Sequence, residues 1–332
     1  MPRPTLVALT LALVCFSTAL AARGERLAAF DGRCILAGCV APPSNIPDIL
    51  GRRALPARRL ARLGATPDVH HGLLAQDGAK VVTKQDVIYG RVEGSALLAD
   101  LAYPVAAANA KRPALMYVHG GRWRSGTRND PSAVNVAKWA ESGYFTMTIE
   151  YRLVGGSPAP ASYEDTLCAI RWLHAHAGEY NVDPDRIYLI GFSSGGHLVT
   201  LAATLGDGPF KRVGGWETAR TDVRAVIATG GAYDLNPLSW GNLWAPITGD
   251  QVEARRLASP LHQVTPKSRP MLIVHSDDDK SVPIQQAVDM VNALEAARVP
   301  HRFLHYTDRG HMGATEEVLK EVRAFIAEIE KR

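Results

Sequence analysis

Beyond residue 81, short apolar runs alternate with segments of helical periodicity. The runs short and apolar enough for buried strands are residues 115–118, 145–149, 187–190, 225–228, 271–274 and 303–306. Helical patterns lie near residues 131–142, 163–177, 194–205, 284–297 and 315–329. This alternation predicts a mostly parallel sheet with helices on both faces. Residues 81–89 and 97–103 predict an antiparallel pair of strands before it.

The first 22 residues have the features of a secretory signal peptide. Arg3 supplies a positive start, an uncharged apolar run follows, and Ala19 and Ala21 form a small-x-small cleavage site. The run is short for a bilayer span, and Arg23 follows it at once. We therefore expect cleavage and a secreted or periplasmic protein without a stable membrane span. An uncleaved anchor is the alternative.

Residues 23–80 form an extension rich in proline and arginine, and residues 81–332 form the main domain. The arginines of the extension could contact an anionic surface, or the segment could simply pack, solvated, on the main domain. Cys34 and Cys39 could form a local disulfide in an oxidising compartment. The sequence before Cys39 also resembles a lipoprotein box, but charged residues interrupt its apolar stretch.

The composition is that of a globular protein. Of 332 residues, 46% are hydrophobic and 21% are charged, which argues against disorder and against a multi-span membrane protein. The net charge of +4 is too small to indicate nucleic-acid binding. Cysteines are too few for a disulfide scaffold, and Cys168 is expected to be a buried thiol. Ligand spacing typical of a metal site is missing, as are nucleotide-binding motifs, so no metal or cofactor is predicted.

The strongest chemical signal follows the strand at 187–190. Residues 191–195 read G-x-S-x-G between a predicted strand and a predicted helix. Such a tight turn exposes the central Ser193, and the small neighbours avoid clashes. The N-terminus of the helix then directs free N–H groups toward developing negative charge. The sequence therefore predicts a nucleophilic serine.

Two glycines follow the strand at 115–118. Consecutive glycines allow the backbone N–H groups to turn toward a negatively charged oxygen. Gly120 and Gly121, together with the N–H of Ser194, are therefore the candidate oxyanion hole. A simple turn is the alternative for two glycines considered alone.

The partners of Ser193 are expected at the ends of two later strands. Serine is a poor nucleophile near neutral pH unless a base lies beside it, and the base needs a group that orients it. His311 follows the last strand and is the candidate base. Asp277, Asp278 and Asp279 follow the strand at 271–274 and are candidates for the orienting acid.

These motifs resemble the α/β-hydrolase-fold carboxylesterases, in particular the hormone-sensitive-lipase-like group and the bifunctional feruloyl and acetylxylan esterases. The resemblance extends over roughly residues 81–329. The family pattern H-G-x-x-D-x-x-V-P falls on residues 275–283, which implies Asp279 as the acid and places Ser276 where relatives have glycine. Arg122 stands where many relatives have a third glycine. His197 resembles a structural position of the family.

The resemblance implies the α/β-hydrolase fold and a serine hydrolase that cleaves carboxylic esters through an acyl-enzyme; the signal-peptide features add the expectation that it is secreted. Only about 30 residues separate Gly230 from Pro260, so a short or absent cap is expected. Trp123, Trp240 and Trp244 lie in loops and are predicted to line an open cleft, with core packing as the alternative.

Such a cleft would suit short-chain, acetyl or aromatic acyl esters, either small molecules or linked to a polysaccharide. An amidase or peptidase would use the same side chains. A noncatalytic binding protein on this fold is a further alternative.

Overall fold

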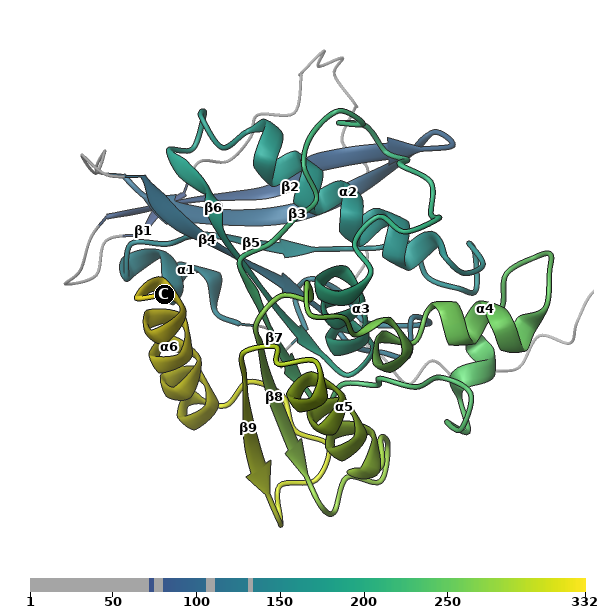
Figure 1. Ribbon diagram of the computed structural model, residues 1–332. Helices are drawn as coiled ribbons and strands as arrows, with labels where there is room; N and C mark the ends of the chain where they lie inside the picture. The colour runs from purple at the N-terminus through teal and green to yellow at the C-terminus, as the bar shows by residue number, and fades with distance from the viewer. Residues whose placement is uncertain (1–71, 75–79, 106–110, 131–133) are drawn as a thin grey trace, which may run out of the picture. The chain divides into compact units, whose positions relative to one another are not determined.

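A nine-stranded sheet organises the part of the chain that the computed structural model describes (Figure 1). The described residues are 72–74, 80–105, 111–130 and 134–332. The predicted signal peptide and the two cysteines of the extension, Cys34 and Cys39, lie outside them. No helix among the described residues is both long enough and apolar enough to cross a bilayer.

The sheet begins with antiparallel strands and continues with parallel ones. The strands are β1 (Gly72–Leu74), β2 (Val81–Val92), β3 (Ser95–Pro104), β4 (Arg112–Val118), β5 (Phe145–Ile149), β6 (Val182–Phe192), β7 (Ala225–Thr229), β8 (Met271–Ser276) and β9 (His301–Tyr306). Their spatial order is β1-β2-β3-β5-β4-β6-β7-β8-β9. Pairing is antiparallel from β1 to β5 and parallel from β5 to β9.

Helices cover both faces of the sheet, as predicted. They are α1 (Val136–Glu141), α2 (Ala161–Ala175), α3 (Ser194–Thr204), α4 (Gln251–Leu257), α5 (Gln285–Ala296) and α6 (Glu316–Glu330). Side chains of α2, α3 and α5 belong to one hydrophobic cluster, and those of α1 and α6 belong to a second. Because both faces are covered, every residue of β5, β7 and β8 is buried.

The fold is the predicted one, with shifted element boundaries. β1 pairs with β2, so the sheet begins before residue 81. The helix expected at 131–142 is described only from Val136 to Glu141. Between β7 and β8 lie α4 and two short 3-10 helices, η1 (Gly241–Leu243) and η2 (Pro260–Gln263), which form a short insert.

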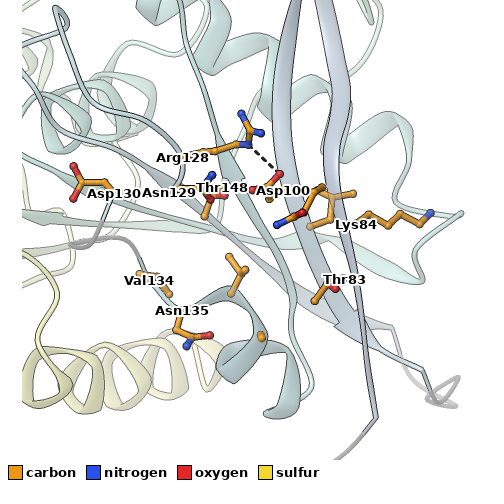
Figure 2. A pocket seen from close by; sticks show the side chains of 13 residues that line it. Thr83, Lys84, Asp100, Arg128, Asn129, Asp130, Val134, Asn135 and Thr148 are labelled. Atoms are coloured by element: carbon orange, nitrogen blue, oxygen red, sulfur yellow. Dashed lines mark ion pairs between the residues drawn. The ribbon is translucent and has the colours of Figure 1, made fainter. Parts of the chain in front are cut away.

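A cavity of about 510 Å³ with both charged and apolar lining residues lies beside β2, β3 and α1, and none of the predicted site residues lines it (Figure 2). Arg128 lines one side of it and pairs with Asp100 through Nε at 2.9 Å. The same guanidinium also pairs with Asp86 and, at 2.8 Å, with Glu150. Arg128 therefore joins β2, β3 and the end of β5, and we assign it a structural role.

Candidate active site

Ser193 occupies a sharp turn between β6 and α3. Its backbone has φ 54° and ψ −118°, a conformation that a residue with a Cβ rarely adopts. The flanking glycines make the turn possible. A Cβ at Gly195 would lie 2.1 Å from the carbonyl oxygen of Val118, and one at Gly191 would lie 2.3 Å from the carbonyl oxygen of Gly195. Only glycine fits at both positions.

A row of two hydrogen bonds joins three segments that are distant in the sequence. The Ser193 Oγ lies 2.9 Å from Nε2 of His311, and Nδ1 of His311 lies 2.7 Å from Oδ2 of Asp279. The imidazole is partly buried, and the Phe192 ring lies 4.8 Å from it, centroid to centroid. A Cβ at Gly230 would approach the imidazole to 3.1 Å on another side. The imidazole is therefore placed to accept the proton of the serine hydroxyl, and the carboxylate is placed to orient the imidazole.

Asp279 is fixed by hydrogen bonds to both carboxylate oxygens. Its Oδ1 accepts the backbone N–H groups of Ser281 and Val282 at 2.8 and 2.9 Å, while Oδ2 faces His311. Burial raises the pKa of this carboxyl, but the hydrogen bonds from His311 and from the backbone more than offset it, so the pKa lies below its ordinary value. Asp279 is therefore ionised across the neutral range.

The other two candidate acids face elsewhere. Asp277 pairs with the exposed His305, with 2.5 Å between Oδ1 and Nε2. Asp278 accepts the Ser276 hydroxyl at 2.6 Å and the backbone N–H of Gly310 at 2.7 Å. Of the three aspartates, only Asp279 contacts His311.

Ser276 and Asp278 together form a bridge between the loop after β8 and the loop that carries His311. The Ser276 hydroxyl donates to Asp278 and accepts the backbone N–H of Arg309 at 2.9 Å. Asp278 also binds the neighbouring Gly310 N–H. The sequence contained one signal of this Ser276–Asp278 bridge, namely a serine where relatives have glycine, but its role depends on contacts that the sequence does not show.

The first of the two glycines after β4 packs against Ser193. A Cβ at Gly120 would lie 3.1 Å from the Cβ of Ser193, so this backbone is in contact with the serine. The Gly121 carbonyl accepts the N–H groups of Arg124 and Ser125 at 3.0 and 3.1 Å and closes a tight turn. Within the described residues, the N–H groups of Gly120, Gly121 and Ser194 have no hydrogen-bond acceptor. These three N–H groups are the ones that the sequence predicts as an oxyanion hole.

The structure corrects the prediction that three tryptophans line the cleft. Trp123, Trp244 and Trp240 are only 0%, 1% and 6% exposed. The rings of Trp240 and Trp244 lie 5.1 and 5.3 Å from that of Trp123, and Trp244 also packs on His197. The indoles fill the space beneath the loop after β4 instead of facing substrate, because burial of their large apolar area is favourable.

His197 is part of this core and has a single tautomer. Its Nδ1 accepts the Trp123 Nε1–H at 3.2 Å, so the proton resides on Nε2, which donates to the carbonyl oxygen of Ala258 at 2.7 Å. Burial lowers the pKa of His197 to about 4. The imidazole is therefore neutral at physiological pH and positions Trp123 and the segment that precedes η2.

Fold and geometry together place the chain in the α/β-hydrolase class, with a serine elbow after β6 and histidine and aspartate at the ends of later strands. The profile of the BD-FAE family matches residues 99–294, more than half of the chain. The chain belongs to the BD-FAE family.

The chain is also similar to individual relatives and solved structures. Esterase LipC of Mycobacterium tuberculosis is 28% identical over 249 residues, which are 70% of this chain and 60% of LipC. A truncated carbohydrate esterase from gut microbiota superposes with a TM-score of 0.66 at 24% identity, over 79% of this chain and 100% of that one. Esterase Est2 of Thermogutta terrifontis, solved with propionate, gives 0.62 at 24% identity over 76% and 95% of the two chains.

The chain spans 44% to 60% of the length of the first curated relatives it matches. The likeness to the solved structures establishes the fold. In the described part of the chain, no group of three or more histidine, cysteine, aspartate or glutamate side chains is arranged to hold a metal ion.

Proposed function

We propose that this protein is a carboxylic ester hydrolase in which Ser193 is the nucleophile, His311 the base and Asp279 the residue that orients the base. The observation that carries the proposal is the unbroken row from the Ser193 Oγ through His311 to a buried, ionised Asp279. Family membership and the esterases among its relatives support the same reaction.

The proposed reaction proceeds in two acyl transfers. The Ser193 Oγ attacks the ester carbonyl carbon while Nε2 of His311 takes the hydroxyl proton. The carbonyl oxygen becomes an oxyanion that accepts hydrogen bonds from the N–H groups of Gly120, Gly121 and Ser194. When the intermediate collapses, His311 returns the proton to the departing alcohol. Water, activated by His311, then releases the acid from the serine.

The proposed substrates have small acyl groups, such as short-chain, acetyl or aromatic acyl esters. The insert between β7 and β8 contains the seven-residue helix α4 and the two short 3-10 helices η1 and η2, so little chain is available to form a deep acyl tunnel. Export is proposed on the signal-peptide features of residues 1–22 alone.

The test is hydrolysis of p-nitrophenyl acetate by the wild-type protein and its variants. Ser193→Ala and His311→Ala should each reduce kcat by at least about 10³-fold. Asp279→Asn should have a similarly large effect, because the amide neither orients nor stabilises the charged imidazole. Asp277→Asn is the matched control, since its carboxylate pairs with His305 at the surface, and it should retain activity.

Comparison of an ester with its matching anilide separates an esterase from an amidase. We expect turnover of the ester and little turnover of the anilide. Full activity of Ser193→Ala would refute the proposed mechanism, and the absence of turnover of any ester or anilide would favour a noncatalytic protein.

A further inference from the structure

A cavity of about 310 Å³ lies beside the loop after β4, and its charged lining is entirely basic. The lining residues are Gly121, Arg122, Arg124, Ser125 and Leu243. Both arginines are exposed to solvent. A concave surface with this lining attracts anions and lowers the cost of bringing one close.

Arg128 lies six residues after Arg122, and its charge is neutralised by carboxylates of the protein itself. Arg128 pairs with three carboxylates, among them Asp100 and Glu150. In contrast, the described residues contain no ion-pair partner for Arg122 or for Arg124. These two guanidinium groups are therefore available to an anion from outside the protein.

Arg122 is held in position by its own side chain and backbone. The guanidinium carbon lies over the Trp240 ring, 5.7 Å from its centre, a cation–π contact that leaves the guanidinium N–H groups free to donate. The backbone φ is 56°, a conformation that glycine adopts more readily. An arginine in a conformation suited to glycine, at the rim of a cavity, points to a use for the side chain.

The cavity is connected to the candidate oxyanion loop through Gly121. The backbone of Gly120 contacts Ser193, with a Cβ at Gly120 reaching within 3.1 Å of the serine Cβ. The next residue, Gly121, already lines the cavity. A substrate whose carbonyl oxygen lies at the N–H groups of these two glycines therefore has one of its substituents within reach of the arginines.

We infer that Arg122 and Arg124 form a carboxylate-binding subsite and that the preferred substrates are esters carrying a carboxylate on the acyl or the alcohol part. This inference rests on the proposed esterase function. Planar guanidinium groups bind carboxylates through paired N–H donors, which gives both affinity and orientation. A dicarboxylic monoester is an acyl donor of this kind, and an acetylated uronic acid presents the carboxylate on the alcohol part.

The test compares two pairs of matched esters. On the acyl side, the mono-p-nitrophenyl ester of glutarate is compared with p-nitrophenyl pentanoate, after subtraction of spontaneous hydrolysis. On the alcohol side, p-acetoxybenzoate is compared with its methyl ester. The measured quantity is the ratio of kcat/KM for the anionic ester to that for the neutral ester. The intrinsic reactivity of each ester is the same for every variant, so a change in this ratio between variants reports only the effect of the substitution.

Arg122→Gln and Arg124→Gln should each lower this ratio about tenfold in at least one pair, mainly through KM for the anionic ester. Arg122→Gly removes the same charge and suits the positive φ, so it keeps the test valid should the glutamine variant fold poorly. Arg124→Lys should recover part of the ratio. Lys320→Gln removes a charge from the exposed face of α6 and should leave the ratio unchanged.

A lower ratio in the glutarate pair places the carboxylate on the acyl part, and a lower ratio in the acetoxybenzoate pair places it on the alcohol part. Unchanged ratios in both pairs for all the Arg122 and Arg124 variants would overturn the subsite while leaving ester hydrolysis in place. Failure of the proposed function is distinct, since the neutral esters would then not be hydrolysed by the wild-type protein.

Discussion

Single residues determine how precisely the candidate site is held. Asp279 has both carboxylate oxygens engaged by hydrogen bonds, and Ser193 has a backbone conformation that only its glycine neighbours permit. The sequence predicted the residues that meet, because each follows a buried strand and the carboxyl ends of parallel strands lie at one edge of a sheet. Their catalytic roles stay predictions until the variants are measured.

Other residue-level features could not be read from the sequence. The position of Trp123 in a loop suggested access to substrate, yet its backbone φ of 58° accompanies a side chain that is fully buried. The Ser276–Asp278 bridge joins two loops more than thirty positions apart. Side-chain direction in a loop depends on backbone angles and on packing that local sequence does not determine.

The Ser276–Asp278 bridge makes Ser276→Gly a test of positioning. Loss of the hydroxyl frees the backbone N–H of Arg309 and leaves the His311 loop less constrained. We expect kcat for p-nitrophenyl acetate to fall about tenfold, since a misplaced base costs rate, while KM stays within about twofold. Ser276→Thr retains the hydroxyl and should restore most of kcat. An unchanged kcat in Ser276→Gly would show that the bridge does not position His311.

At the scale of elements, the close packing of α3 against the sheet shapes the turn that carries Ser193. Strand positions were predictable because the buried central strands are mostly apolar, which local sequence reveals. β6 begins at Val182, earlier than predicted. Its first residues are partly polar, so the apolar pattern did not reveal them as part of the strand. The helix α4 was missed for a related reason: it has no buried residue and so carries no apolar stripe.

Gly195→Ala tests the close approach of α3 to β4. The new Cβ would lie 2.1 Å from the carbonyl oxygen of Val118, so the helix must shift. We expect a loss of about 2 kcal/mol or more in the free energy of unfolding, measured with urea, and a large loss of esterase activity. Gly178→Ala is the control, since its Cβ would meet nothing within 4 Å. Equal stability of the two variants would contradict the packing.

At the scale of the whole molecule, several histidines are buried in the core. Burial lowers the pKa of His119, His197 and His275. In the unfolded chain these groups take up protons at higher pH than in the folded protein. The folded state therefore loses stability as the pH falls below the unfolded histidine value of about 6.5.

His197 supplies the clearest case because its folded pKa is about 4. Between pH 6.5 and 4 it should destabilise the protein by on the order of 3 kcal/mol, and the loss should be complete near the folded pKa. The free energy of unfolding measured over this range should fall less steeply for His197→Gln than for the wild-type protein. The same pH dependence of the free energy of unfolding in both proteins would show that His197 does not contribute to the loss of stability at low pH.

The most direct test of the central claim is covalent labelling with a fluorophosphonate, followed by mass spectrometry of the adduct and its peptides. The probe reacts with a serine only where a neighbouring base activates the hydroxyl. We predict one adduct per chain on Ser193, with no labelling of Ser193→Ala and a strongly reduced rate in His311→Ala. Labelling that persists in Ser193→Ala, or an adduct located on another serine, would contradict the account.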